Sequence, residues 1–470
     1  MKKLLLILLC LPMIGFGQQA YVPDDNFETY LEANGMGNGI ANDDFVTTAN
    51  INTINTLDVD NMNIADLTGI EGFTALDGLS VDSNLLTILD VSNNPVLTQL
   101  SCGSNQLTTL NVSNNLILHT LMCQNNLLTI LDVSNKPALT QLSCGSNQLI
   151  TLEVSTNTAL YILHCENNQL TTLEVSNNPA LYILNCDNNQ LTTLDVSNNP
   201  ALAGFHCANN QLTTLNVSNN PVLHTFMCQN NLLTTLDVSN YTSLYSLWCS
   251  SNQLTSLDVS NNTLLTGLFC EDNQLTNLDV STNTALFNLY CDSNLLTTLD
   301  ISQNTALTIL SCSFNQLTTL DVSNNTDFYL LLCDNNQLTS LDLSNNPAFL
   351  GLYCHTNQLT SLDVRNGSNS NFHLFCCSSN PNLNCINVDN VVWSTANWTV
   401  GNINSLGISQ IDPQHYFSTN CSVTDIQEHT TNKELLKVTD LLGRERKGKK
   451  NDPLFYIYND GTVKKRIVLE

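Results

Sequence analysis

Thiols at a constant spacing are the first feature of this 470-residue chain that could carry chemistry. Of its 18 cysteines, 13 follow one another at a step of 21 residues, from Cys102 to Cys354. Val59 and Val81 occupy the same slot upstream, and Cys377 occupies it after a two-residue insertion. Redox and metal chemistry need a thiolate, which valine cannot provide. We therefore predict buried packing thiols that behave as small apolar side chains.

Disulfides between neighbouring repeats are not expected along this series. If the repeats stack as parallel strands, equivalent Cβ atoms lie about 4.8 Å apart, whereas a disulfide needs about 3.5–4.5 Å. Cys10 lies in the N-terminal leader described below, and its removal leaves 17 cysteines. An odd number leaves at least one thiol free or bonded to another molecule.

Aromatic and acidic side chains vary beside the cysteine, while the rest of each repeat stays nearly constant. For example, three consecutive cysteines of the 21-residue series are directly preceded by Trp248, Phe269 and Tyr290. Uniform positions are set by packing, and large apolar side chains on an exposed face are typical of binding surfaces. The alternative is that the rings only stack along the sheet and stabilise it. We predict a ligand-binding site made of Tyr245, Trp248, Phe269, Glu271, Phe287, Tyr290, Asp292 and Tyr353.

A second series places an acidic residue in 12 of 14 repeats between Asp90 and Asp363. Neighbouring like charges destabilise each other, so something should compensate. Calcium between repeats is one explanation, since it prefers oxygen ligands. Solvation with hydrogen bonds to nearby backbone amides is the other explanation, and we favour it. We therefore predict no cofactor and no metal site.

Other kinds of chemistry find little support. His164 and His206 lie two repeats apart, about 9–10 Å, which is too far to bind one zinc ion. The sequence holds no nucleophile elbow, phosphate-binding loop or HExxH motif, so we do not expect an enzyme. Between the leader and the last forty residues, only Lys136 and Arg365 oppose 35 acidic residues. This charge would repel phosphates, so no nucleic-acid partner is expected.

Each repeat must contain two short extended segments and two turns to position these side chains. In LYSLWCSSNQL (244–254), inward leucine and cysteine alternate with outward residues, which is the period of a strand. The asparagine of the turn, here Asn252, can both donate to and accept from buried backbone groups. A unit of this size cannot bury its own apolar side, so the units must stack into a solenoid.

The pattern LxxLxCxxNxL is the leucine-rich repeat signature, and the chain resembles internalin J-like bacterial surface proteins with a cysteine ladder. The resemblance covers roughly residues 50–385. It implies a β-rich leucine-rich repeat solenoid of right-handed 21-residue coils. It also implies a parallel sheet along the cysteine strand, with few or no helices outside an N-terminal cap.

The flanking segments resemble the caps of related flavobacterial repeat proteins. Asp24 or Asp25 would cap a short helix near the N-terminus. Cys385 and Cys421 lie outside the ladder, and we expect them to pair. The expected domains are a signal peptide at 1–20, an N-terminal cap at 21–50, the solenoid at 51–379, a C-terminal cap at 380–421, a linker at 422–433 and a sorting signal at 434–470.

Both ends of the chain have the pattern of export signals. Residues 1–20 combine two lysines, a short apolar run and small residues, as cleavable signal peptides do. The basic segment 434–470 resembles the C-terminal sorting signal of the type IX secretion pathway. That resemblance implies passage across the outer membrane, followed by release or attachment to lipopolysaccharide. The alternative is an independent β-hairpin that turns at Asp460-Gly461.

These patterns together predict a secreted or cell-surface protein that binds a partner through its variable face, with adhesion as the purpose. The partner would be a protein or a glycan on another cell or surface, and no transmembrane helix is expected. A surface carbohydrate-binding protein and a passive rigid spacer, roughly 80 Å long, are the alternatives.

Overall fold

The computed structural model describes residues 18–400, 402–404, 407–421, 435–439, 444–445, 453–458 and 463–467. The predicted signal peptide, apart from its last three residues, and the predicted linker lie outside the described residues, as do parts of the predicted sorting signal. The chain divides into two compact units, Met1–Thr419 and Asn420–Glu470.

A parallel sheet with one short strand per coil dominates the first unit. Its strands are β3 (Thr56–Asp58), β4 (Gly78–Ser80), β5 (Gln99–Ser101), β6 (Thr120–Met122), β7 (Gln141–Ser143), β8 (Ile162–His164), β9 (Ile183–Asn185), β10 (Gly204–His206), β11 (Thr225–Met227), β12 (Ser246–Trp248), β13 (Gly267–Phe269), β14 (Asn288–Tyr290), β15 (Ile309–Ser311), β16 (Leu330–Leu332), β18 (Gly351–Tyr353), β20 (Leu374–Cys376) and β23 (Gly407–Gln410). Each strand pairs in register with the next, as Leu247 does with Leu268.

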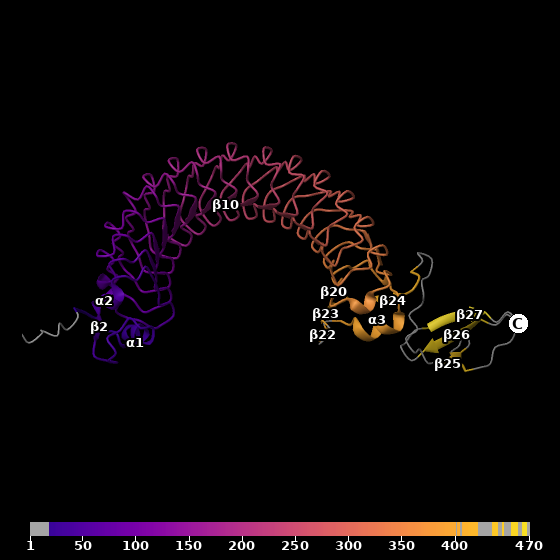
Figure 1. Ribbon diagram of the computed structural model, residues 1–470. Helices are drawn as coiled ribbons and strands as arrows, with labels where there is room; N and C mark the ends of the chain where they lie inside the picture. The colour runs from indigo at the N-terminus through magenta and orange to yellow at the C-terminus, as the bar shows by residue number, and fades with distance from the viewer. Residues whose placement is uncertain are drawn as a thin grey trace, which may run out of the picture. The chain divides into compact units, whose positions relative to one another are not determined.

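This sheet is an open ribbon, since no described pairing joins its first strand β3 to its last strand β23. Figure 1 shows the coils side by side along a curve, with β10 and β20 on its inner side. The predicted leucine-rich repeat solenoid is therefore confirmed.

The ladder cysteines fill the core of this solenoid. All thirteen from Cys102 to Cys354 are free and 0% exposed. Val81 is equally buried in the same slot. Burial raises the pKa of each ladder thiol, as it does for Cys249. A buried protonated thiol is a poor nucleophile, so these groups act as packing side chains.

A first column of buried asparagines holds the turn after each ladder strand. Asn252 is representative: its Nδ2 donates to the carbonyls of Cys228 (3.0 Å), Cys249 (3.2 Å) and Ser250 (3.1 Å). Its Oδ1 accepts from the backbone N–H of Leu233 at 3.0 Å. One side chain thus satisfies four backbone groups in two consecutive coils.

A second column of asparagines holds the other turn with fewer bonds. Nδ2 of Asn262 donates to the carbonyls of Val238 (2.9 Å) and Tyr241 (2.8 Å). Its Oδ1 is buried without a hydrogen-bond partner. Lys136 and Tyr241 themselves replace asparagine in this column, and both are buried. The second column therefore tolerates substitutions that the first column does not show.

The second extended segment of each coil is less regular than the sequence pattern suggests. In the described residues its paired strands lie near the C-terminal end of the solenoid, at β17 (Ser340–Asp342) and β19 (Ser361–Asp363), and isolated bridges join Asp90 with Asn111 and Glu153 with Glu174. The acidic series lies on this segment and is mostly exposed. Most of its carboxylates accept a hydrogen bond from the residue two positions on, as when Ser260 N–H donates to Asp258 at 2.9 Å. These bonds hold the pKa of Asp258 below its usual value, and they are the compensation we favoured.

The N-terminal end of the solenoid is covered by a hairpin and two short helices. β1 (Gln19–Tyr21) pairs antiparallel with β2 (Phe45–Thr47), and the helices are α1 (Asp25–Ala33) and α2 (Thr48–Ile51). Asp24 caps α1 by accepting from the N–H groups of Asn26 and Phe27, both at 3.0 Å. A 3-10 turn, η1 (Ile70–Gly72), follows β3.

The C-terminal segment 380–421 continues the strand pairing, although its sequence departs from the repeat. β21 (Cys385–Asn387) and β24 (Tyr416–Ser418) extend the sheet that β17 and β19 begin. η2 (Asn369–Asn371), α3 (Val391–Asn397) and β22 (Asn402–Asn404) complete this end. Trp398 stacks on Phe375 with ring centroids 4.0 Å apart. Cys385 and Cys421 are both disulfide-bonded, and their bond to each other stays a prediction.

The second unit contains three antiparallel strands, β25 (Leu435–Thr439), β26 (Pro453–Tyr458) and β27 (Val463–Ile467). The turn predicted at Asp460-Gly461 lies outside the described residues. In the described part of the chain, no helix has the length and apolar character needed to cross a bilayer.

Candidate ligand-binding face

Three positions of each coil point outward from the ladder strands: the residue directly before the cysteine, the residue directly after it, and the residue four positions before it. We call the surface that they form the strand face. Trp248, Phe269 and Tyr290 lie on it in consecutive strands and pair directly with one another. The Trp248 and Phe269 rings stack with centroids 3.8 Å apart at 17°, and Phe269 and Tyr290 with centroids 5.1 Å apart at 19°.

These three rings are half-buried and not fully exposed, because each covers its neighbour. Trp248 is further held by a bond from its Nε1 to Ser246 Oγ at 2.9 Å. Stacked rings that keep one accessible side form a rigid apolar platform. The stack is compatible with both sequence-based readings, a binding platform and a stabilising ladder.

A second row of rings borders this platform. Tyr245 and Phe287 are each 49% exposed, which is high for aromatic side chains. The hydroxyl of Tyr245 accepts a hydrogen bond from Thr225 Oγ1 at 2.8 Å. Tyr353 lies apart from this group, because β15 and β16 separate its strand β18 from β14. The structure thus brings most of the predicted ring residues together and leaves Tyr353 outside.

Glu271 and Asp292 follow the ladder cysteines of adjacent coils on the same face. Asp292 accepts from Ser311 Oγ at 2.5 Å and from the N–H of Ser313 at 2.9 Å. Glu271 keeps one buried carboxylate oxygen, Oε2, without a partner. Burial raises the pKa of both carboxyl groups above the usual values. Partly desolvated carboxylates beside aromatic rings can bind a cation or accept hydrogen bonds.

No basic side chain neutralises these carboxylates in the described part of the chain. Its salt bridges are His355–Asp334, Arg365–Asp363 and His415–Asp412. Lys136 is buried in the second asparagine column and is not a residue of the strand face. The strand face is therefore an anionic and aromatic surface.

A second acidic pair, Glu166 and Asp187, lies on the same face, and our predicted site omitted it. Asp187 accepts from the N–H of Ala208 at 2.5 Å, and burial raises its pKa to about 6. Five residues before these carboxylates in the same two coils, Tyr161 and Tyr182 stack with centroids 5.0 Å apart at 4°. The sequence does contain a signal for this pair: Glu166 lies 105 residues before Glu271, and Asp187 lies 105 residues before Asp292.

The pH dependence of stability should reveal this buried carboxylate. Because the folded-state pKa of Asp187, about 6, exceeds the usual aspartate value of about 3.9, protonation favours the folded state. We expect wild-type protein to gain stability, relative to Asp187→Asn, as the pH falls from 7 to 4. Urea denaturation of both proteins at several pH values measures this difference. A difference that does not change with pH would mean that Asp187 is not desolvated.

His164 lies on β8 and His206 on β10, and strand β9 separates them, as expected. The group of potential metal ligands in the described residues is Asp25, Glu28 and Asp44 at the N-terminal cap. Glu28 there already accepts from the N–H groups of Asp43 and Asp44 at 3.1 and 3.3 Å. This cluster therefore has an internal structural role.

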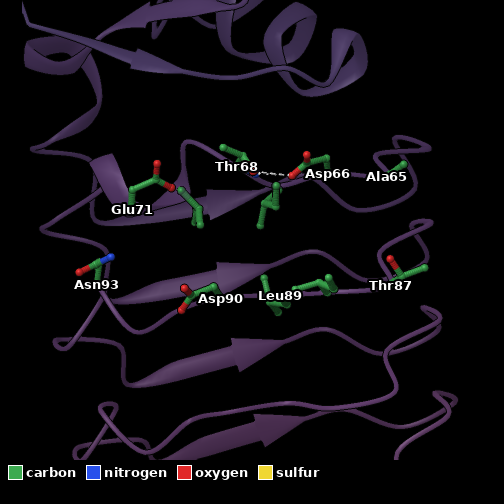
Figure 2. Close-up of a pocket in the computed structure, with 11 residues that line it drawn as sticks. Ala65, Asp66, Thr68, Glu71, Thr87, Leu89, Asp90 and Asn93 are labelled. Carbon is green, nitrogen blue, oxygen red and sulfur yellow. Dashed lines mark hydrogen bonds between the residues drawn. The ribbon is translucent and has the colours of Figure 1, made fainter.

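A pocket of about 560 Å³ lies away from the strand face, near η1 (Figure 2). Asp66, Glu71 and Asp90 contribute to its lining. Each accepts a local backbone hydrogen bond: Asp66 from Thr68 at 2.8 Å, Glu71 from Gly69 at 2.8 Å and Asp90 from Ser92 at 2.9 Å. These carboxylates are engaged in turns, unlike the unpartnered oxygen of Glu271.

Stacked coils that each give one strand to an open parallel sheet and leucines to the core define a leucine-rich repeat protein. Thirteen consecutive coils of this chain also bury a cysteine. The functional domain of InlJ from Listeria monocytogenes, which includes a cysteine ladder, is similar with a TM-score of 0.65 and 36% identity, over 79% of this chain and 77% of that one. The chain therefore belongs to the leucine-rich repeat proteins of the InlJ cysteine-ladder type.

Two further structures share the fold. A leucine-rich repeat protein of Leptospira interrogans has a TM-score of 0.56 and 22% identity, over 71% of this chain and 92% of that one. The plant peptide hormone receptor RGFR1 in complex with RGF2 has a TM-score of 0.54 and 18% identity, over 68% and 64%. The LVIVD repeat model matches residues 123–143, which is one coil. No curated protein sequence matches the chain.

Proposed function

We propose that this protein binds a protein partner on its strand face, outside the cell, and serves in adhesion. The observation that carries the proposal is the ring stack of Trp248, Phe269 and Tyr290 beside Glu271 and Asp292. A preorganised aromatic platform loses little entropy on binding. Further support comes from the plant receptor that shares the fold and was solved with RGF2 bound.

Replacing Trp248, Phe269 and Tyr290 together by alanine tests the proposal. A hot-spot contact contributes about 2 kcal/mol or more. We therefore expect the affinity for cultured host cells to fall by a factor of about thirty or more. The matched control replaces the exposed residues Thr255, Ser260 and Asn261, on the other extended segment, by alanine. Circular dichroism checks the fold of both variants.

Equal cell binding by the two variants would contradict the proposal. A glycan array probed with the wild-type protein separates the carbohydrate alternative from the protein one. Strong binding to specific glycans, lost in the aromatic variant, would replace the protein partner by a glycan.

The proposed route to the cell exterior uses the signal peptide 1–20 and type IX secretion, with the option of attachment to lipopolysaccharide. The support is the resemblance of residues 434–470 to a sorting signal and their separation into a second unit. Deleting 434–470 should retain the folded protein in the periplasm, as measured by cell fractionation. Normal surface display of the truncated protein would refute the sorting assignment.

A further inference from the structure

Part of the sequence also recurs at a step of five coils, or 105 residues. Residues 107–135 and 212–240, which are 105 residues apart, agree at 25 of 29 positions. The agreement includes variable slots of the strand face, such as Met122 with Met227 and Gln124 with Gln229. The coil adjacent to the first of these has Ser143 and Gly145 in the same slots. Residues 86–114 and 128–156, two coils apart, agree at 24 of 29 positions, so the likeness of whole coils does not by itself define the period. The slot after the cysteine does.

The residues directly after the cysteine slot, which is Val81 in one coil, recur at the same step of 105 residues. Asp82, Asp187 and Asp292 are 105 residues apart, and each is followed one coil later by a small residue. In every copy the backbone N–H of that small residue donates to the aspartate: Gly103 at 2.5 Å, Ala208 at 2.5 Å and Ser313 at 2.9 Å. Sequence period and hydrogen-bond geometry thus agree.

Glu166 and Glu271 occupy equivalent places one coil before the second and third of these aspartates. Each has a buried Oε2 atom without a hydrogen-bond partner. Each also lies against a small residue of the preceding coil: a Cβ added to Gly145 would be 2.3 Å from Glu166 Oε1, and Ser250 bonds Glu271. The strand face therefore carries the same glutamate–aspartate pair twice.

Stacked rings lie in the coils of both pairs. Tyr161 and Tyr182 lie five residues before the first pair, and Phe269 and Tyr290 lie two residues before the second. A guanidinium group stacks on aromatic faces and binds carboxylates through two parallel hydrogen bonds. An ammonium group is also attracted to ring faces. Two carboxylates with no lysine or arginine beside them in the described residues provide a complementary surface for such cations. At the first pair, His164 and His206 lie on the same face.

We propose that the strand face binds a partner segment with two cationic groups, one at Glu166–Asp187 and one at Glu271–Asp292. This inference rests on the proposed function and specifies the chemistry of the partner. Five coils at about 4.8 Å separate the two sites by about 24 Å, which an extended chain spans in about seven residues. Simultaneous contact at both sites raises affinity through effective concentration.

The test uses synthetic peptides and the full-length protein. One peptide carries two Arg-Arg pairs separated by five Gly and Ser residues, and a second carries a single Arg-Arg pair. A third places both pairs next to each other. Isothermal titration should show at least tenfold tighter binding of the spaced peptide than of either other peptide, because only it reaches both sites.

Two double variants should lower this affinity to the single-pair level by similar factors: Glu166→Gln with Asp187→Asn, and Glu271→Gln with Asp292→Asn. Amides keep the shape and remove a desolvated charge, so both variants should fold. The control, Asp237→Asn with Asp258→Asn, removes two exposed charges from the acidic series and should leave binding unchanged within a factor of about two.

Equal affinity for the spaced and adjacent peptides would overturn the inference, and so would an equal loss in the control. Displacement of the peptide by millimolar calcium, with a stoichiometric calcium-binding signal, would assign the carboxylates to a metal instead. Failure of the peptide test with retained loss of cell binding in the aromatic variant would reject this inference alone. Failure of both would reject the proposed function as well.

Discussion

The ladder thiols should resist iodoacetamide in the folded protein at least about a thousandfold more strongly than in denatured protein. Each of the thirteen thiols is fully buried, and burial raises its pKa. The reagent therefore cannot reach the sulfur, and the reactive thiolate does not form, unless the coil opens. An opening that costs about 4 kcal/mol exposes a thiol about one-thousandth of the time. Quantitative mass spectrometry of alkylated peptides measures the rate for each cysteine.

The protection should be greatest in central coils and weaker toward the ends, because a solenoid opens from its termini. The variant Cys249→Val tests whether the thiol acts only as a packing side chain, because valine fills the same slot at Val81. That variant should change the free energy of unfolding by less than about 1.5 kcal/mol. Disulfides between neighbouring rungs, such as Cys249 with Cys270, would refute the packing role.

Asn252→Ala should destabilise the solenoid by about 3–5 kcal/mol, a large effect for one side chain. The substitution removes four hydrogen bonds to backbone groups of two coils, those of Cys228, Leu233, Cys249 and Ser250. Each buried backbone group left without a partner costs about 1–3 kcal/mol, and water relieves part of that. The shift of the urea denaturation midpoint measures the loss.

Asn262→Ala is the matched comparison in the second asparagine column. It removes two hydrogen bonds, to the carbonyls of Val238 and Tyr241, and an oxygen that has no partner. We therefore expect about half the destabilisation of Asn252→Ala. Equal losses would show that the bonds of the first column do not account for its uniformity.

The repeat made the fold predictable, because one spacing specified every coil. Asn252 and Cys249 recur with the leucines at a step of 21, and their burial follows from stacking alone. Local chemistry also allowed the cap of α1 to be placed at Asp24 or Asp25, and the structure selects Asp24. Such features depend on near neighbours in sequence or on equivalent residues in the next coil.

The C-terminal end was less predictable. Cys385–Asn387 and Tyr416–Ser418 pair with the solenoid across intervening segments of irregular length. Spacing carries no information there, and the continuation depends on packing such as that of Trp398 on Phe375. A departure from the repeat therefore need not end the stacked coils.

Only part of the candidate site could be predicted, because spacing gives the face on which a residue lies and not the rotamer of its side chain. Neighbouring slots placed Trp248, Phe269 and Tyr290 on one face, but how far each ring covers the next depends on side-chain rotamers. The pairing of Glu166 with Asp187 as an equivalent site needs a period of 105 residues, which a comparison of adjacent coils does not reveal.

Site-specific photo-cross-linking tests the central claim, partner binding on the strand face, most directly. A benzophenone amino acid replaces Phe269 in one variant and Thr255, on the other extended segment, in the second. After irradiation on the surface of target cells, the account predicts a discrete protein adduct from position 269 and none from position 255. An adduct from position 255 alone, or the same adducts from both positions, would contradict it.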